Sequence, residues 1–596
     1  MYIKQVFGGI MNIYEKIDQL RSMMREYDIE AYVVATSDPH QSEYLPDHYK
    51  TREFISGFTG SAGTAVITQD KAGLWTDGRY FTQAERELKN TPFKLYRMGI
   101  DQDYINFLNE EVEEFGKLAL DGKCMSLASY NSMSERLGQR LIRTDLDFIS
   151  QIWTQDRPAL PKDKVFIFDE KYAGQRLEEK LQILRAMMDN RGVDYFFIGA
   201  CEDISYLFNL RGNDITATPV FISFALITKD RASLFIEPEK IDEEILNYLA
   251  ERNVDVYDYD HIYTKMNEIP GKSVVYFDPT RTNVLIYQKL NRNVRIKKGI
   301  NLTTLMKALK NRTELDNFQK AYDKDAAALV KFFNWVETGV STGNIDEVLA
   351  ANKLLDFRRE QEGFIEFSFE TISAYGENAA MPHYDPHKVI PKALKDRGLY
   401  LVDSGGQYMD GTTDITRVIA LGNLSDEEKL HYTLTLKAHI AAMSAKFMKG
   451  TTGMYLDSIC RYPMNKYGLD FNHGTGHGIG FVLGVHEGPM SISKRDGGIP
   501  LEEGMVFSIE PGIYIEGSHG IRIENIVHVV KSEYEGFYEL DPFSYVPIDT
   551  RPIEPSLMED WEIDWLNSYH LECRRRLKDR LEGESLEYMM RMTRAI

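Results

Sequence analysis

The sequence is poor in positive charge and in cysteine, and each shortage excludes a class of function. Lysine and arginine together number 70 against 91 aspartates and glutamates, so the formal net charge is −21. A nucleic-acid-binding protein needs a basic face to neutralise phosphates, and we therefore expect no nucleic-acid partner. The cysteines have neither the spacing of a metal site nor that of a disulfide framework, which is typical of a reducing compartment; they are Cys124, Cys201, Cys460 and Cys573.

Long hydrophobic runs are also missing. No apolar run approaches the roughly 18 residues that a membrane-spanning helix needs. The segment from Met1 to Met11 is too short and too polar for the apolar region of a secretory signal, and we treat it as an extension ahead of a second possible start at Met11. These absences predict a cytoplasmic protein that binds no membrane.

The length and composition are those of a multidomain globular protein, and the N-terminal half contains a repeat. With 596 residues, of which 43% are hydrophobic and 27% charged, three or four domains are expected. Leu184-Arg-Ala-Met-Met188 echoes Leu20-Arg-Ser-Met-Met24, and the run at 193–198 echoes that at 29–34, both at an offset of 164 residues. A period this long indicates a duplicated domain rather than a solenoid, although two helix–strand units can also resemble each other by chance.

Three domains follow from this organisation. Alternating helices and strands make residues 1–158 and 159–304 two similar α/β domains, separated by a proline-containing linker at 157–162. Residues 305–596 mix hairpins and helices, which predicts an α+β domain with helices backing a curved antiparallel sheet. The elements predicted in this domain are a capping box beginning at Thr313 before a helix to about 337, a helix at 345–361, a strand at 366–373, a helix at 426–446 with Ser425 as its N-cap, and a helical tail at 561–596 that packs on its own domain.

Two predicted hairpins in the third domain bring acidic residues together. Asp403 and Asp414 stand at the ends of β-prone runs on either side of a glycine-rich turn, so their carboxylates can lie side by side on neighbouring strands. Glu510 and Glu524 repeat this arrangement, and His477 lies in a glycine-rich loop between the two hairpins. The flanking runs are 399–403, 414–421, 506–510 and 521–530, with the second turn at 517–520.

Four carboxylates and one imidazole in this arrangement predict a metal centre. Like charges packed so closely repel one another by several kcal/mol in a semi-buried site unless positive charge lies among them. A pair of divalent metal ions supplies that charge, and the oxygen-rich ligand set suits Mn, Fe, Co or Zn better than a structural cysteine–zinc site. The alternative is that each acid is a solvated turn residue and His477 a capping group. This alternative is less convincing because all five residues fall in one segment with strand–turn–strand context.

The same segment resembles the catalytic domain of the pita-bread metallopeptidases, most closely that of the Xaa-Pro aminopeptidases of the long, three-domain type. In that family the positions matching Asp403, Asp414, His477, Glu510 and Glu524 bind a dinuclear metal centre, usually of manganese. The motifs that carry the resemblance are 403–414, His473-Gly-Thr-Gly-His477-Gly, Glu510-Pro-Gly, Arg522-Ile-Glu524, and far upstream Trp75-Thr-Asp-Gly-Arg-Tyr-Phe81 and Leu207-Phe-Asn-Leu-Arg-Gly212.

The resemblance also implies roles for residues beyond the ligands. His383, His473 and His486 match positions that line the substrate pocket and stabilise the tetrahedral intermediate. Arg522 matches an arginine of the substrate pocket, and Arg79 matches one that reaches the substrate from the N-terminal domain. Each of these residues could instead have a purely structural role, the histidines as hydrogen-bonded structural groups and the arginines in structural ion pairs.

Chemistry suggests how the ligands divide their work. Two metal ions bridged by carboxylates would hold a water between them and lower its pKa toward neutrality, which gives hydroxide at the working pH. Asp403 is the candidate terminal ligand of one metal, Asp414 and Glu524 are the candidate bridges, and His477 is the ligand of the other metal. Glu510 lies beside the attacking water, where it can also carry a proton to the leaving nitrogen.

The implied function is release of the N-terminal residue from peptides whose second residue is proline. A tertiary Xaa-Pro amide has no N–H and restricted geometry, so ordinary aminopeptidase sites accommodate it poorly. Three alternatives stay open: a prolidase, which has these ligands but cleaves dipeptides; a methionine aminopeptidase, which lacks the long N-terminal region; and a metal-free binding protein, which would have lost ligands. The resemblance further implies a homodimer formed through the catalytic domain, so the tail could serve an interface.

Overall fold

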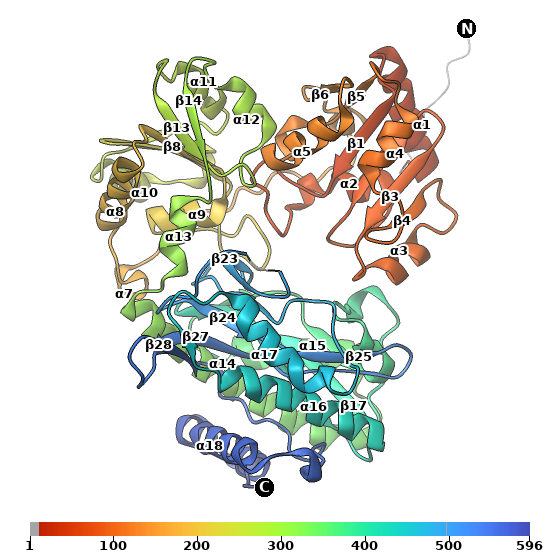
Figure 1. The fold of residues 1–596 in the computed structure, drawn as a ribbon, viewed down its shortest axis with the longest axis vertical. Coiled ribbons are helices and arrows are strands. Elements are labelled where there is room, and N and C mark those ends of the chain that lie inside the picture. Colours follow the sequence, from red (N-terminus) through yellow and green to blue (C-terminus); the bar gives the residue numbers. More distant parts are fainter. Residues whose placement is uncertain (1–10, 496) are drawn as a thin grey trace. The chain divides into compact units, whose positions relative to one another are not determined.

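The computed structural model describes residues 11–495 and 497–596, and these form two compact units (Figure 1). The predicted extension at residues 1–10 lies outside the described residues. None of the helices in the described ranges has the length and apolar character of a bilayer-spanning segment. The first unit runs to Ile167 and includes Leu177–Thr216 and Val220–Leu302, and the second consists of Phe168–Arg176, Ala217–Pro219 and Thr303–Ile596.

The first unit contains two six-stranded sheets with the same strand order. That order is β4-β3-β2-β1-β5-β6 in one sheet and β12-β11-β10-β8-β13-β14 in the other. Each central strand, β1 (Ala31–Ala35) or β8 (Tyr195–Ile198), pairs antiparallel with one neighbour and parallel with the other. The helices before them, α1 (Ile13–Glu26) and α8 (Leu177–Asn190), begin 164 residues apart. The predicted duplication is therefore confirmed in the topology.

Helices cover both faces of the first sheet, which explains why β1 is apolar throughout. Tyr32 and Val34 pack in a cluster with residues of α1, whereas Ala31 and Val33 pack on the other face with residues of α4 and α5. A strand that is buried on both faces has no solvent side and so shows no polar alternation. The remaining elements around this sheet are β2 (Thr64–Thr68), β3 (Ala72–Thr76), β4 (Lys94–Arg97), β5 (Lys117–Ala119), β6 (Leu141–Arg143), α2 (Thr51–Ser56), α3 (Phe81–Glu87), α4 (Tyr104–Glu111), α5 (Leu127–Leu137) and α6 (Phe148–Ile152).

The second sheet of this unit has the same kind of surroundings. Strand β10 (Ser223–Thr228), the antiparallel neighbour of β8, is almost entirely buried. The other elements are β11 (Ala232–Ile236), β12 (Val254–Tyr257), β13 (Val274–Phe277), β14 (Arg295–Lys298), α9 (Cys201–Phe208), α10 (Glu243–Ala250), α11 (His261–Glu268) and α12 (Val284–Lys289), with the short pair β7 (Phe166–Ile167) and β9 (Leu210–Arg211) beside them.

The second unit is built on antiparallel sheets packed against helices, which agrees with the predicted α+β class. A six-stranded sheet runs β21-β28-β27-β24-β22-β23, and a three-stranded sheet runs β16-β17-β20. Its strands are β15 (Phe364–Phe367), β16 (Ile372–Tyr375), β17 (Leu399–Ser404), β18 (Gly406–Tyr408), β19 (Gly411–Thr412), β20 (Ile415–Ala420), β21 (Phe447–Met448), β22 (Gly476–Gly478), β23 (Glu487–Ile492), β24 (Val506–Ile509), β25 (Gly512–Ile515), β26 (His519–Arg522), β27 (Asn525–Lys531) and β28 (Phe537–Pro542).

The helices of the second unit include the predicted C-terminal tail. Leu566 and Tyr569 of the tail lie in one buried apolar cluster of this unit, and Leu577 and Met589 lie in another, so the tail packs on its own domain as predicted. In Figure 1 the ribbons of α14, α16 and α17 run alongside the strands of this unit. The helices are α7 (Glu170–Ala173), α13 (Leu302–Ala308), α14 (Arg312–Gly339), α15 (Glu347–Arg359), α16 (Asp426–Met443), α17 (Gly453–Asn465), α18 (Asp560–Leu577) and α19 (Gly583–Met592).

Some local predictions need correction. The capping box of α14 uses Asn311 with Glu314, two residues before the predicted Thr313, because Asn is as good an N-cap as Thr and the glutamate stands three residues after Asn311. The strand predicted at 366–373 is two strands, β15 and β16, and the run at 521–530 is interrupted between β26 and β27. Ser425 caps α16 as predicted, with its side chain accepting from the backbone N–H of Glu428.

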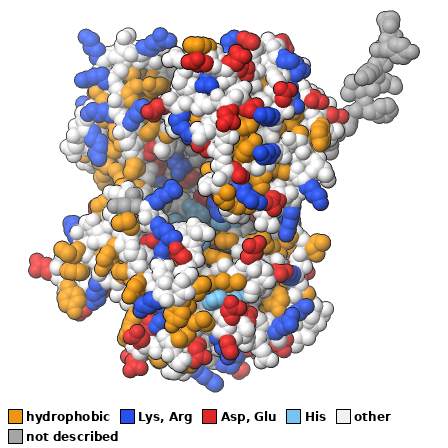
Figure 2. All heavy atoms as spheres, turned by 45° about the vertical axis from the view of Figure 1, so that its right-hand side comes forward, with side chains coloured by type: hydrophobic (Ala, Val, Ile, Leu, Met, Phe, Trp, Pro, Cys, Tyr) orange, Lys and Arg blue, Asp and Glu red, His pale blue; other side chains and the backbone are white. Residues whose placement is uncertain are grey.

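Acidic and basic side chains are interspersed over the face drawn in Figure 2. The excess of acidic residues in the sequence is therefore not gathered into a single patch on this face.

Candidate metal centre

The first predicted hairpin places Asp403 and Asp414 on adjacent strands. Asp403 is the second-last residue of β17 and pairs with Thr416 of β20, while Asp414 directly precedes β20. Residues two apart on a strand share a face, so Asp414 and Thr416 lie on the same side of β20. The residues Asp403 and Asp414 are 8% and 3% exposed, and both therefore lie in the interior.

The second pair of acids comes from β24 and β27. Ile509 pairs with Asn525, and Glu510 and Glu524 are the next residues beyond that pair, one on each strand. The intervening chain forms its own two-stranded hairpin from β25 and β26. Glu524 consequently lies in the short break between β26 and β27 rather than within one long strand.

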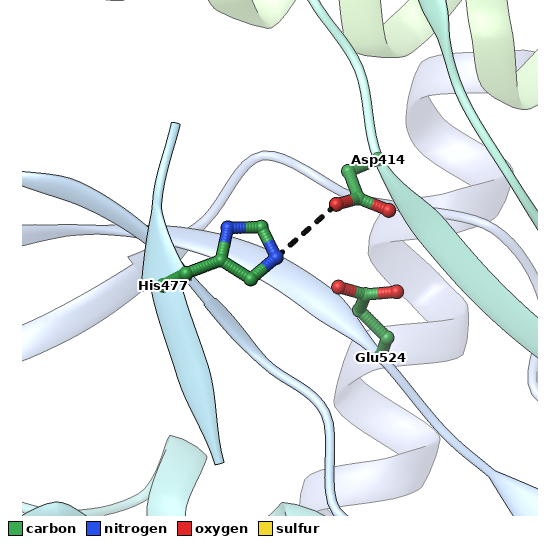
Figure 3. Close-up of side chains that lie close together, drawn as sticks. All are labelled: Asp414, His477 and Glu524. Carbon is green, nitrogen blue, oxygen red and sulfur yellow. Dashed lines mark ion pairs between the residues drawn. The ribbon is translucent and has the colours of Figure 1, made fainter. Parts of the chain in front are cut away.

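His477 completes the group from the middle of β22. Ligand atoms of Asp414, His477 and Glu524 all lie within 4.8 Å of one another, as the close-up in Figure 3 illustrates. The Nε2 atom of His477 is 3.5 Å from Oδ2 of Asp414 and 3.8 Å from Oε1 of Glu510. The structure therefore brings His477 close to three of the four predicted acids. Asp403 is linked to Glu524 through Arg522, which donates to Asp403 and to the hydroxyl of Thr416, and Thr416 donates to Glu524.

Burial and mutual repulsion both act on the carboxyl groups of this site. The pKa of Asp414 is raised well above its usual value, by burial first and then by the charges of the other three acids. Burial, followed by the charge of Glu524, raises the pKa of Glu510 in the same direction. Burial, followed by the charge of Asp403, raises the pKa of Glu524 to about 8. Divalent cations among these groups would favour the charged carboxylates and reverse the shifts.

The residues fit a metal ion in two further respects. Oδ1 of Asp403 is buried and has no hydrogen-bond partner among the residues that the structure describes, although buried polar atoms are almost always paired. Burial lowers the pKa of His477 well below its usual value, so the imidazole is neutral and its nitrogen can donate a lone pair to a metal. Hard oxygen donors with one imidazole suit first-row divalent ions.

Arg522 connects Asp403 to the predicted substrate pocket. Its Nη2 atom donates to Oδ2 of Asp403 at 2.5 Å, and its Nη1 atom donates to the hydroxyl of Tyr514 at 2.7 Å. That hydroxyl also lies 2.8 Å from Nε2 of His473, whose pKa is lowered to about 3 by burial and then by the charge of Arg522. A continuous hydrogen-bonded chain therefore runs from Asp403 to His473.

Sequence reasoning missed Tyr514 and Thr416, both of which touch the site. The hydroxyl of Thr416 donates to Oε2 of Glu524 at 2.7 Å. Its position two residues after Asp414 on a predicted strand was a signal that it faces the same way. Tyr514 faces Gly520 across the β25–β26 hairpin, two residues from Arg522, but the sequence alone did not place this hairpin at the site.

A buried arginine behind the site connects Glu524 to the C-terminal helix α18. Arg417 donates to the backbone carbonyl of Glu524 at 2.6 Å, to the side chain of Asn525 at 2.7 Å and to the hydroxyl of Tyr569 at 2.7 Å. Tyr569 in turn donates to the carbonyl of Val546 at 2.9 Å. The tail therefore helps to fix the strand break in which Glu524 lies.

The other predicted histidines are near the group, and Arg79 is in the first unit. The rings of His486 and His477 meet edge to face with their centroids 4.3 Å apart. His383 is exposed and lies near enough to His473 for its charge to lower the pKa of His473. Arg79 is exposed and forms an ion pair with Asp77 at 2.7 Å, so its role at the substrate stays a prediction.

Comparison with known proteins agrees with this geometry. The profile of metallopeptidase family M24 matches residues 316–531, and its C-terminal region matches 536–596. Creatinase/prolidase N-terminal domains match twice, at 16–150 and 156–314. The chain therefore belongs to the M24 metallopeptidases, in the branch with two creatinase-like N-terminal domains.

The relatives narrow the placement within that family to the Xaa-Pro aminopeptidase P proteins. A probable Xaa-Pro aminopeptidase P of Neurospora crassa is 37% identical, over 98% of this chain and 89% of the relative. Aminopeptidase P2 of Arabidopsis thaliana is 36% identical, over 96% of this chain and 87% of the relative. The solved X-prolyl aminopeptidase of Caenorhabditis elegans, described as a cytosolic enzyme with a di-nuclear active site, superposes with a TM-score of 0.93 at 33% identity, covering 98% of this chain and all of that one.

Proposed function

We propose that this chain is a metal-dependent aminopeptidase that hydrolyses the bond between an N-terminal residue and a proline in the second position. The observation that supports this most is the convergence of ligand atoms of Asp414, His477 and Glu524 within 4.8 Å. Asp403 adds a buried oxygen with no hydrogen-bond partner in the described part of the chain. The full-length similarity to an X-prolyl aminopeptidase with a di-nuclear active site supports two metal ions and this substrate class.

Five residues would hold the two divalent ions, for which manganese is the proposed identity. These residues are Asp403, Asp414, His477, Glu510 and Glu524. When bound, the ions would polarise the scissile carbonyl and lower the pKa of a water toward neutrality. The hydroxyl of Thr416 holds the carboxylate of Glu524, and Arg522 holds that of Asp403, so two of the ligands are already oriented.

The catalytic steps then fall to three residues of the chain. Glu510 would take a proton from the attacking water and deliver it to the nitrogen of the leaving proline. His486 and His383 would donate hydrogen bonds to the carbonyl oxygen as negative charge develops on it. The contact between the rings of His486 and His477 supports this role, because it places a donor beside a proposed ligand.

Substrate binding would use the chain of residues that ends at His473. His473, Tyr514 and Arg522 are joined by hydrogen bonds and present an imidazole and an aromatic ring beside the ligands. Such a surface can accept a proline ring, which offers no N–H to the enzyme. Arg79 of the first unit is proposed to bind the peptide beyond its proline, which a prolidase acting on dipeptides would not require.

The decisive experiment combines metal removal with a choice of substrates. Chelation should abolish cleavage of a Xaa-Pro-Yaa tripeptide, and Mn²⁺ should restore it more fully than Zn²⁺, Co²⁺ or Fe²⁺. Cleavage of a Xaa-Pro dipeptide but not of the tripeptide would instead indicate a prolidase. Full activity in protein that elemental analysis finds free of transition metal would refute the metal-dependent mechanism.

Assembly, location and domain boundaries remain predictions. The proposed homodimer can be checked by light scattering coupled to size-exclusion chromatography, and the cytoplasmic location by cell fractionation. Limited proteolysis would test the division near residue 158, since cleavage is expected at exposed linkers. The division near residue 304 falls within α13, where Leu302 and Thr303 are fully buried, and offers no such linker.

A further inference from the structure

The segment that carries His486 alternates between buried and exposed residues. Val485 is fully buried and Glu487 is 6% exposed, whereas His486 between them is exposed and touches His477. The position of the His486 ring is therefore set by how firmly its two neighbours are held.

Apolar packing holds the chain before His486. The loop between β22 and β23 buries several side chains against α14 and the segment around α7. Val485 is one of them, and Phe481 meets the ring of Phe318 at 5.1 Å and that of Phe168 at 6.0 Å between centroids. The other members from this loop are Ile479 and Val482.

A buried ion cluster holds the chain after His486. Oε2 of Glu487 lies 2.8 Å from Nζ of Lys307, and its other oxygen accepts from Nζ of Lys310. The three charged side chains are between 1% and 8% exposed. The backbone N–H of Lys310 also donates to the carbonyl of Gly504 at 3.0 Å, and Glu314 adds negative charge near Lys310. Glu487, Lys307 and Lys310 are called the Glu487 cluster below.

The Glu487 cluster also acts on the strand that carries His477. Glu487 pairs with Gly478 of β22, and a shift in register falls between His477 and Gly478. A Cβ atom at position 478 would lie only 2.1 Å from the carbonyl oxygen of Glu487, so only glycine permits this approach. Glu487 is therefore adjacent to His486 along the chain and to the residue after His477 across the sheet.

We propose that the Glu487 cluster positions His486 against His477 for the hydrolysis, which makes Glu487, Lys307 and Lys310 positioning residues rather than catalytic ones. This inference rests on the proposed function, in which His486 donates to the developing oxyanion. Burying charges is an uncertain way to gain stability, because apolar side chains of the same volume often do as well. What the ion cluster adds is direction, since two lysines approach both oxygens of one carboxylate and fix its orientation.

The test uses metal-loaded full-length enzyme with substitutions that disturb the Glu487 cluster to different extents. Glu487→Gln removes the negative charge between two lysines, whereas Lys310→Met leaves Lys307 paired with Glu487 and is the variant expected to fold most readily. Both should lower kcat about tenfold or more, because misplacing a reacting group by about 1 Å can cost on the order of 10²-fold. KM and the content of bound metal should stay near their wild-type values.

Lys437→Met provides a matched control in the same unit. Lys437 of α16 forms a partly buried ion pair with Glu562 of α18 and, among the residues that the structure describes, makes no hydrogen bond or ion pair with any proposed ligand. Its loss should leave kcat unchanged. A kcat loss in Lys437→Met equal to that in Lys310→Met would assign both ion pairs to general stability and overturn the proposal.

Combining each substitution with His486→Ala separates positioning from other effects. If the Glu487 cluster acts through His486, then Lys310→Met should cost no further activity once His486 is alanine. Fully additive losses would overturn the inference while leaving the proposed function intact. Wild-type turnover in His486→Ala alone would instead refute the proposed role of His486. Crystal structures of Lys310→Met and wild type should also differ in the separation of the His486 and His477 rings, and an unchanged separation would contradict the proposal without reference to activity.

Discussion

The raised pKa of Glu524 predicts that this carboxyl group destabilises the metal-free folded protein as the pH rises from 6.5 to 8. The perturbation is Glu524→Gln, which removes one charge and keeps an oxygen that can accept from Thr416. Burial and the neighbouring acids raise the pKa of Glu524 to about 8 in the folded protein, against an ordinary value of 4.5. The folded state therefore binds more protons than the unfolded state, and its stability falls as these protons are lost.

The magnitude follows from the width of that pH interval. One pH unit corresponds to about 1.4 kcal/mol for a group that titrates only in the folded state, so Glu524 accounts for about 2 kcal/mol between pH 6.5 and 8. Buried histidines such as His473, whose pKa is lowered to about 3, act in the opposite direction at the start of this range, because their unfolded-state pKa lies near 6.5. Wild type and Glu524→Gln share this effect, so it cancels in the difference between them. The metal-loaded enzyme should lack the slope, because its carboxylates are already ionised.

The assay is chemical denaturation of chelated wild type and chelated Glu524→Gln, followed by tryptophan fluorescence at several pH values. Between pH 6.5 and 8, the free energy of unfolding of the variant should rise by about 2 kcal/mol relative to that of the wild type. If the free energy of unfolding of the variant, relative to the wild type, stays constant or falls as the pH rises, the electrostatic reasoning is refuted. The Mn²⁺-loaded proteins are the control, since their difference should not depend on pH.

The remaining predictions concern the pocket. His486→Ala should lower kcat on the order of 10²-fold with metal content near normal, as the loss of one oxyanion donor does; turnover equal to wild type would make His486 a structural residue. Tyr514→Phe breaks the link between Arg522 and His473 and should raise KM more than it lowers kcat, so steady-state kinetics with an unchanged KM would contradict a binding role. Arg79→Ala should raise KM for a Xaa-Pro-Yaa-Zaa peptide and leave a Xaa-Pro dipeptide unaffected. Equal kinetics with both substrates would remove Arg79 from the site.

The acids of the site were predictable from sequence because each stands at the end of a strand. Asp403 and Asp414 flank a glycine-rich turn, and the pairing of β17 with β20 forms the hairpin that the β-prone runs on either side of this turn indicated. The repeat in the first unit was visible because helix and strand recur at the same offset, and the two sheets have the same strand order. The local sequence pattern was sufficient to predict which residues lie together wherever they are neighbours in sequence or in a hairpin.

Contacts between distant segments were not predictable in the same way. Lys310 and Glu487 are 177 residues apart, and the local sequence around neither residue predicts the contact between them. The end of β26 likewise looked like part of a longer strand, because the run from Ile521 to Val530 was interpreted as one continuous strand. The break at Glu524 exists because Arg417 and Thr416 of another strand hold its backbone and its carboxylate.

The attachment of Tyr569 to Arg417 has a consequence for how the enzyme is made. During synthesis the domains of a chain generally fold in order from the N-terminus. All five proposed ligands leave the ribosome before α18, yet the backbone around Glu524 is braced by a hydroxyl of that helix. The nascent catalytic domain therefore carries its acidic cluster before the brace exists. Metal loading would belong to the final stage of maturation, after translation has delivered the tail.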